Sequence, residues 1–263
     1  MGPITADTLV ISDVHLGSDV SRAREATRLL QIATFRRLIL LGDIFCDLNF
    51  RRLQKHHWKF LSEIRKLSNP RRDIEVVWVE GNHDRGLSQV MSHLVGVQVY
   101  EEYCWEFRGT RFLAVHGHQF DRFLVNNALL SRLGEWIYLQ LQRLDSRSNR
   151  LSRFLDRQNS RWLRLSPKVC KGALALARER GAGVVICGHT HQPMQAGQNG
   201  IRYVNSGCWT SSHVPTYVAI SESGISLCEF ATQELPAVDE WKHDDGWGHE
   251  DEVAYTVSGS GTA

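Results

Sequence analysis

One pattern recurs five times along this chain: an apolar run followed at once by a short turn that carries histidine, aspartate or asparagine. The five segments are 9–15, 38–43, 76–84, 112–118 and 184–191. Each apolar run has the length and composition of a buried strand. In open α/β sheets, ligands bind beyond the carboxyl ends of the strands, so these five turns predict one shared site at a sheet edge.

The last segment holds two histidines, His189 and His191, separated by one residue and preceded by Gly188. Residues i and i+2 share a face of a strand, and a glycine lets the following turn bend so that both rings converge. Two neutral imidazoles held close together indicate a divalent cation between them. A packing role explains an isolated His-x-His pair equally well, but it does not explain five such segments in one chain.

Side chains from the five turns are expected to bind metal: Asp13, His15, Asp43, Asn82, His116, His189 and His191. Oxygen and imidazole donors without thiolate favour Mn²⁺, with Fe or Zn²⁺ as alternatives, over a cysteine-rich structural zinc site. Seven ligands exceed the needs of one ion, so we expect two divalent ions about 3.5–4 Å apart that share a carboxylate. Such a pair acidifies a bridging water and holds phosphoryl oxygens, which predicts phosphoester hydrolysis.

The length of 263 residues suits one domain with an insertion. A formal net charge of +2 gives no general attraction to polyanions, so nucleic acid is not an expected partner. The six cysteines lack C-x-x-C spacing and the first residues lack a signal-peptide pattern, which predicts a reducing, cytoplasmic setting. No run approaches the roughly 18 apolar residues of a membrane span, so any membrane contact is expected to be peripheral, on the inner face.

Strand and helix segments alternate early in the chain and hairpins follow late, which predicts an α/β (α+β) fold with two sheets flanked by helices. Helices are expected at 22–32 and 51–67. Hairpin turns are expected at 108–110 and 222–224. His56 and His57 lie on the second helix and are expected to be surface or packing residues.

The domain is expected to span 1–235, with a helical insertion at about 121–170. Residues 121–168 carry ten basic and four acidic side chains, interleaved with leucine, tryptophan and other apolar residues at helical spacing. Two interpretations stay open: a subdomain whose apolar stripes pack on each other, or a cationic amphipathic lid that contacts an anionic lipid surface. Residues 236–263 hold seven acids without a periodic apolar pattern and are expected to be a disordered tail.

Five motifs resemble, in the same order, those of the calcineurin-like metallophosphoesterases: Asp13-x-His15, Gly42-Asp43, Gly81-Asn82-His83-Asp84, His116 and Gly188-His189-x-His191. The resemblance covers about 9–230 and implies a four-layer fold, in which helices flank a two-sheet β-sandwich. It implies a first metal on Asp13, His15 and His191. It implies a second metal on Asn82, His116 and His189, with Asp43 bridging the two. His83 would protonate the leaving oxygen or stabilise the transition state, oriented by Asp84. A packing role for His83 is the alternative.

Three further features resemble one branch of this superfamily, the UDP-2,3-diacylglucosamine pyrophosphatases of lipid A synthesis: residues 42–45, residues 116–121 with the insertion after them, and residues 203–209. The resemblance implies a lipid-linked nucleotide-sugar substrate and a peripheral membrane contact through 121–168. His83 stands where the best-characterised members have arginine, and Cys46 and Cys208 stand where acids are frequent.

Two other functions stay open. One is a general phosphodiesterase or phosphatase on small soluble substrates, and the other is a metal-binding interaction module without turnover. A nuclease is disfavoured, because leucines interleave the basic residues where base stacking would need aromatic rings. The sequence predicts no oligomeric state.

Overall fold

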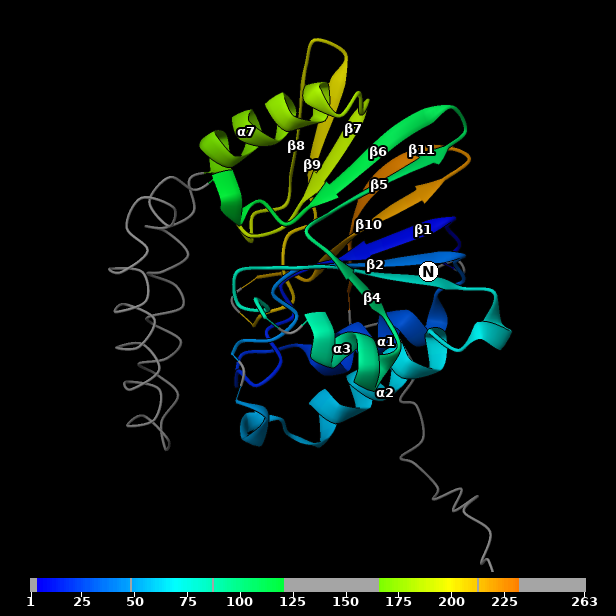
Figure 1. Cartoon of the computed structure of the whole chain (residues 1–263), viewed down its shortest axis with the longest axis vertical. Helices are drawn as coiled ribbons and strands as arrows, with labels where there is room; N and C mark the ends of the chain where they lie inside the picture. Colours follow the sequence, from blue (N-terminus) through cyan, green and yellow to red (C-terminus); the bar gives the residue numbers. More distant parts are fainter. Residues whose placement is uncertain (1–3, 48, 87, 121–165, 212, 232–263) are drawn as a thin grey trace, which may run out of the picture. The chain divides into compact units, whose positions relative to one another are not determined.

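The computed structural model describes residues 4–47, 49–86, 88–120, 166–211 and 213–231 (Figure 1). These residues belong to one unit of the chain, Met1–Thr232. Residues 121–165 of the insertion predicted at about 121–170, and the tail predicted from 236, lie outside the described residues.

The first sheet has six strands in the order β11-β10-β1-β2-β3-β4. Its strands are β1 (Thr8–Ile11), β2 (Arg37–Leu41), β3 (Glu75–Val79), β4 (Gln98–Tyr100), β10 (Thr216–Ser221) and β11 (Gly224–Glu229). Strands β1 to β4 run parallel, and β10 pairs antiparallel with β1. The carboxyl ends of β1, β2 and β3 therefore meet at one edge of the sheet.

The second sheet has five strands in the order β5-β6-β7-β9-β8. Its strands are β5 (Glu102–Phe107), β6 (Thr110–Val115), β7 (Val184–Cys187), β8 (Met194–Gln198) and β9 (Ile201–Asn205). Strands β6, β7 and β9 run parallel, so that their carboxyl ends also share an edge. The predicted hairpin between β5 and β6 is confirmed: Arg108 and Gly109 both adopt positive φ, as a tight two-residue turn requires.

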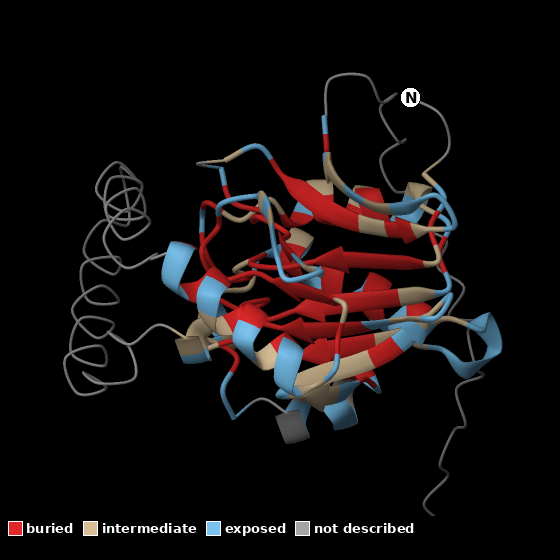
Figure 2. Ribbon diagram, turned by 90° about the horizontal axis from the view of Figure 1, so that it is seen from above, coloured by how far each residue is buried: buried red, intermediate tan, exposed pale blue. Residues whose placement is uncertain are grey.

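The two sheets pack face to face on an apolar core that draws side chains from both. Val10, Ile39 and Val77 of the first sheet belong to the same buried cluster as Phe112 and Ile186 of the second. Alternate residues on each strand point to the opposite face, which the helices cover. Figure 2 shows most of the strand residues buried and the outer surfaces of the helices exposed.

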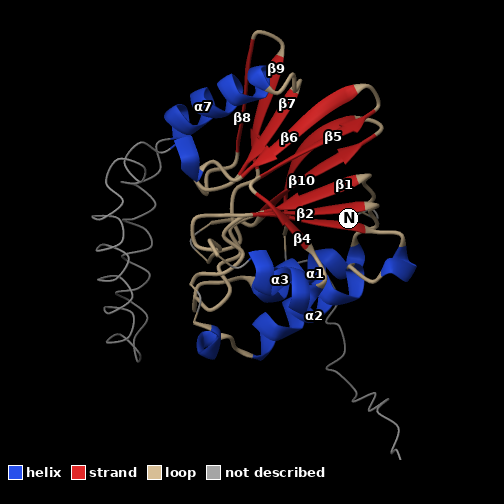
Figure 3. Cartoon of the chain, in the orientation of Figure 1, coloured by secondary structure: helices blue, strands red, loops and turns tan. Residues whose placement is uncertain are grey.

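Helices α1 (Ala23–Ile32), α2 (Lys55–Leu67) and α3 (Ser88–Val95) gather beside the first sheet (Figures 1 and 3). Helix α7 (Ser166–Glu179) packs on the outer face of the second sheet, where its Ala173 and Ala177 meet Val185 of β7. The order helix, sheet, sheet, helix confirms the predicted two-sheet fold flanked by helices.

Two predicted boundaries differ from the structure. The second helix begins at Lys55 rather than 51, because a 3₁₀ turn (Phe50–Arg52) precedes it and Gln54 caps it reciprocally with His57. Residues 166–170, placed in the insertion by the sequence, form the start of α7, since Val169 and Cys170 are buried. Within the described residues, no helix is long and apolar enough to span a membrane.

Candidate metal centre

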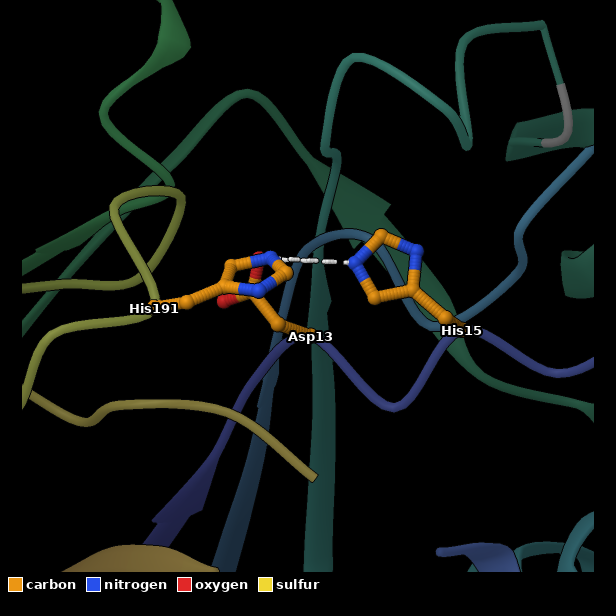
Figure 4. Close-up of side chains that lie close together, drawn as sticks. All are labelled: Asp13, His15 and His191. Carbon is orange, nitrogen blue, oxygen red and sulfur yellow. Dashed lines mark hydrogen bonds and ion pairs between the residues drawn. The ribbon is translucent and has the colours of Figure 1, made fainter. Parts of the chain in front are cut away.

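A first cluster brings together Asp13 and His15, from the turn after β1, and His191, from the turn after β7 (Figure 4). The His191 Nε2 lies 3.0 Å from Asp13 Oδ1 and 3.1 Å from His15 Nε2. Asp13 is fully buried and His191 is 5% exposed, so neither group relies on bulk solvent. A carboxylate oxygen and two ring nitrogens at these separations make a suitable set of ligands for one divalent cation.

A second cluster joins Asp43, after β2, to His116, after β6, and His189, after β7. His116 is fully buried, and its Nε2 lies 3.3 Å from Asp43 Oδ2. The other ring nitrogen, Nδ1, donates to the carbonyl oxygen of Leu41 at 2.9 Å. When that bond holds the only ring proton, the Nε2 lone pair faces Asp43 and is available to a metal.

The two clusters adjoin each other. The backbone N–H of His189, in the second cluster, donates to Asp13 Oδ2, in the first, at 3.0 Å. The backbone N–H of His15 donates to the carbonyl oxygen of Asp43 at 3.1 Å. Six of the seven predicted metal ligands therefore lie in two neighbouring groups, with Asp43 in the second; their binding of metal stays a prediction.

Asn82, the seventh predicted ligand, lies on the loop after β3. Its Oδ1 is buried and has no hydrogen-bond partner in the part of the chain that the structure describes. The next residue anchors the loop at the site, because the backbone N–H of His83 donates to Asp43 Oδ1 at 2.9 Å. A buried amide oxygen without a donor is costly, and coordination to a metal would satisfy it.

The two predicted catalytic residues differ in exposure: His83 is partly exposed, whereas Asp84 is buried. The side chain of His83 is 25% exposed, its Nε2 lies 4.0 Å from Asp43 Oδ2, and its ring centroid lies 5.5 Å from that of His15. The Asp84 carboxylate accepts hydrogen bonds from the backbone N–H groups of Ile44 and Phe45 at 3.1 and 2.9 Å. Asp84 thus ties the loop after β3 to the loop after β2. Its predicted role of orienting His83 stays a prediction.

Five of the candidate ligands adopt left-handed backbone conformations, with φ of 52° at Asp13 and His15, 49° at Asp43, 65° at His189 and 55° at His191. Such conformations are uncommon for residues other than glycine and cost on the order of 1 kcal/mol each. They persist where the surrounding structure enforces them, and they concentrate at functional sites. The backbone is therefore strained at the same positions that carry the ligands.

Two glycines allow the turns to approach each other this closely. A Cβ on Gly188 would lie 2.5 Å from Asp13 Oδ2, and a Cβ on Gly81 would overlap the backbone nitrogen and Oδ1 of Asp43. No side chain fits at either position without moving a ligand. Glycine is therefore required at Gly81 and Gly188, because the candidate metal ligands Asp43 and Asp13 leave no room for a side chain there.

The electrostatics of the site fit divalent cations. Burial lowers the pKa of His116, but the Asp43 carboxylate more than offsets this and raises it to about 9. Burial and the neighbouring His191 lower the pKa of His15 to about 3. Burial opposes ionisation of Asp43, yet His116 and His83 hold its pKa well below the usual value. Without metal, a protonated His116 therefore offsets part of the buried carboxylate charge. Two divalent ions would displace that proton and supply the compensating positive charge.

Two further histidines, which sequence reasoning did not assign to the site, lie beside it. The ring of His118 lies 5.5 Å from that of His116 and 6.4 Å from that of His189, centroid to centroid. Its Nδ1 is buried without a hydrogen-bond partner in the described structure, and burial lowers its pKa to about 3. The ring of His213 lies 6.3 Å from that of His191. The i, i+2 spacing of His116 and His118 was a usable signal, whereas His213 follows no motif.

Comparison with known proteins identifies the family. The model of the calcineurin-like phosphoesterases matches residues 7–193, more than half of the chain. The chain belongs to this family. No curated protein sequence matches it significantly.

One solved structure supports the fold. The E. coli phosphoesterase YfcE superposes with a TM-score of 0.50 at 15% identity, over 88% of this chain and 96% of that one. A novel archaeal phosphodiesterase gives a TM-score of 0.46 at 15% identity, over 84% and 98% of the two chains. Vacuolar protein sorting 29 from Cryptosporidium parvum gives 0.45 at 14% identity, over 85% and 97%. At this identity the similarity to YfcE shows the fold alone.

The family and the clustered ligands together make this chain a metal-dependent phosphoesterase, a hydrolase that acts on phosphoric esters. The predicted superfamily, enzyme class and requirement for divalent metal are confirmed at this level.

Proposed function

We propose that this calcineurin-like phosphoesterase hydrolyses a phosphodiester or diphosphate bond at a dinuclear centre, with Mn²⁺ as its metal and Fe or Zn²⁺ as alternatives. Asp13, His15 and His191 hold the first ion, and Asn82, His116 and His189 hold the second. Asp43 bridges the two ions. The observation that carries this proposal is the pair of adjoining ligand clusters, linked by the bond from His189 N–H to Asp13 Oδ2.

The two ions, when bound, supply an acidified water and polarise the phosphoryl oxygens. The protein contributes orientation and proton transfer. His116 is oriented by its hydrogen bond to the Leu41 carbonyl, which directs Nε2 toward Asp43. His83 is the one predicted catalytic group with marked solvent exposure, so it can meet the leaving oxygen of a substrate and donate a proton to it.

For the substrate we propose a lipid-linked nucleotide sugar of the UDP-2,3-diacylglucosamine type. Support comes from the sequence: residues 42–45, 116–121 and 203–209 resemble that branch, and 121–168 combine basic with apolar side chains. The same composition favours peripheral contact through 121–168 with an anionic membrane surface, on the cytoplasmic side of the inner membrane. The second candidate is a phosphodiesterase or phosphatase on small soluble substrates, because His83 replaces the arginine of the best-characterised members of the branch.

The test compares two substrates on Mn²⁺-loaded protein: UMP release from UDP-2,3-diacylglucosamine, and p-nitrophenol release from bis-p-nitrophenyl phosphate. Strong preference for the lipid substrate supports the lipid A branch. Turnover of the small diester alone refutes that branch and keeps the dinuclear chemistry.

Two variants control for contaminating activity and for unfolding. Asp43→Asn removes the bridging charge and should abolish turnover of both substrates. Thr27→Val, in α1, loses a buried hydroxyl that donates to the Ala23 carbonyl and should leave turnover unchanged. If neither substrate turns over while the protein binds metal, both proposed substrate classes are refuted.

A further inference from the structure

A buried polar network lies behind the metal ligands, where β1, β7 and β9 end. Asn205 is its centre and is fully buried. Its Nδ2 donates to the carbonyl oxygen of Gly188 at 2.6 Å, directly before His189. Its Oδ1 accepts the backbone N–H of Gly207 at 3.0 Å. One amide side chain therefore holds both the turn that bears two candidate ligands and the turn after β9.

The network continues to the turn that bears Asp13. The hydroxyl of Ser12, also fully buried, donates to the carbonyl oxygen of Gly207 at 3.0 Å and lies 2.8 Å from the hydroxyl of Ser206. Ser206 in turn donates to the carbonyl oxygen of Cys187 at 3.1 Å. The loop of contacts closes at the site, because Asp13 Oδ2 accepts the His189 N–H.

Within the residues that the structure describes, this network joins two sheets that share no strand pairing. Strand β1 belongs to the first sheet, whereas β7 and β9 belong to the second. Asp13 and His15 come from one sheet and His191 from the other, so the geometry of the first metal site depends on how the two sheets align at this end. A shift of one sheet against the other by about 1 Å would disrupt the site, because metal–ligand distances tolerate deviations of only about 0.2 Å.

Apolar side chains would pack the same space at lower cost in desolvation, since every buried polar group must find a partner. The Asn205 amide finds partners only because the Gly188 and Gly207 backbones are in place. The network thus favours one arrangement of the turn 188–191, in which His189 and His191 both hold positive φ.

We propose that Asn205, supported by Ser206 and Ser12, is a positioning residue for the metal centre: it sets metal affinity by fixing the His189–His191 turn against Asp13. This inference rests on the dinuclear centre proposed above. Asn205 itself contacts no metal and no substrate in this assignment, and its effect is transmitted through the Gly188 carbonyl.

The experiment measures Mn²⁺ binding to the metal-depleted full chain by isothermal titration calorimetry, with electron paramagnetic resonance to distinguish coupled from free Mn²⁺. Asn205→Ala should weaken Mn²⁺ binding about 10- to 100-fold, the range typical of residues that orient metal ligands. The signal of the spin-coupled pair at two equivalents should be lost or reduced. Thr27→Val is the matched control, because it removes a buried hydrogen bond within helix α1, which carries none of the candidate ligands.

Equal Mn²⁺ affinity in the parent and in Asn205→Ala overturns the positioning role, and so does a loss no larger than that in Thr27→Val. If the parent binds neither Mn²⁺ nor, in parallel titrations, Fe²⁺ or Zn²⁺, the dinuclear centre itself is refuted. If Asn205→Ala does not fold, Ser206→Ala takes its place, because it keeps the Asn205 amide and removes the hydroxyl contact to Ser12. Its affinity should then fall several-fold, and an unchanged affinity overturns the inference.

Discussion

Replacing Gly81 by alanine is a sharp steric test of the site. Glycine at this position faces Asp43 so closely that an added Cβ would overlap the backbone nitrogen and Oδ1, and would lie 3.0 Å from Cγ. The backbone conformation of Gly81 is open to other residues, since its φ is not positive. The entire effect of the substitution therefore comes from this contact.

The overlap cannot be relieved by rotating a flexible side chain. The Asp43 carboxylate accepts a hydrogen bond from the backbone N–H of His83. Backbone hydrogen bonds also join the turn that contains Asp43 to the turn after β1. Relief must move the loop 81–84 or Asp43 itself. Overpacking of this kind costs about 1–3 kcal/mol of stability, and a shift of about 1 Å at a catalytic group costs about 100-fold in rate.

We expect Gly81→Ala to lower kcat/KM for bis-p-nitrophenyl phosphate about 100-fold, which corresponds to about 2.7 kcal/mol of transition-state stabilisation. Gly183→Ala is the matched control: its added Cβ would make an ordinary contact of 3.6 Å with Thr110. Urea unfolding of both variants separates lost stability from lost catalysis. Activity of Gly81→Ala within twofold of the control would refute the reasoning, because it would mean that this contact does not position Asp43.

Three other outcomes are expected. Removing metal with a chelator should lower the thermal midpoint, since ions at 100 times their dissociation constant stabilise a site by about 2.7 kcal/mol; a midpoint unaffected by chelation contradicts a resident metal. Asp84→Ala should lower the free energy of unfolding in urea by roughly 2–4 kcal/mol, because two backbone amides and the Trp78 indole lose their acceptor; a loss below 1 kcal/mol excludes the anchoring role. Burial, with His56 and Arg52, lowers the pKa of His57 from 6.5 to about 4, so the unfolded chain takes up the extra proton between these values. The contribution of His57 to the free energy of unfolding is complete above pH 6.5 and falls by roughly 1–3 kcal/mol as the pH drops to 4. His57→Gln should flatten the dependence of unfolding free energy on pH in this range, and an unchanged slope would refute the lowered pKa of His57.

Local chemistry explains why the sequence was informative about the ligands. A buried parallel strand needs an unbroken apolar run, and polar side chains can follow only in the turn where that run ends. His116 follows such a run directly, and Asp13 and Asp43 follow theirs after one intervening residue. The order of these turns along the chain was enough to predict the cluster, because parallel strands bring their carboxyl ends to one edge.

What the sequence missed depends on contacts between distant residues. Strand β8 is an edge strand whose side chains are largely exposed, so it lacks the apolar pattern that marks the other strands. The start of α2 depends on a reciprocal cap made by Gln54 and His57, an unusual pair for this role. Ser12 and Ser206 meet across 194 positions, and nothing near either serine indicates the other.

The division of ligands between two sheets has a consequence for how this phosphoesterase responds to metal loss. Asp13, His15, Asp43 and Asn82 follow strands of the first sheet, whereas His116, His189 and His191 follow strands of the second. Each of the two proposed ions would take ligands from both sheets, so metal binding would add bonds across the sandwich between sheets that share no strand pairing in the described residues. Amide hydrogen exchange on metal-depleted protein should therefore rise first in the turns 12–16 and 188–191, and not in the β5–β6 hairpin at the far end of the strands. Uniform loss of protection would contradict this, because it would mean that the ions stabilise the fold as a whole and not the alignment of the two sheets at the site.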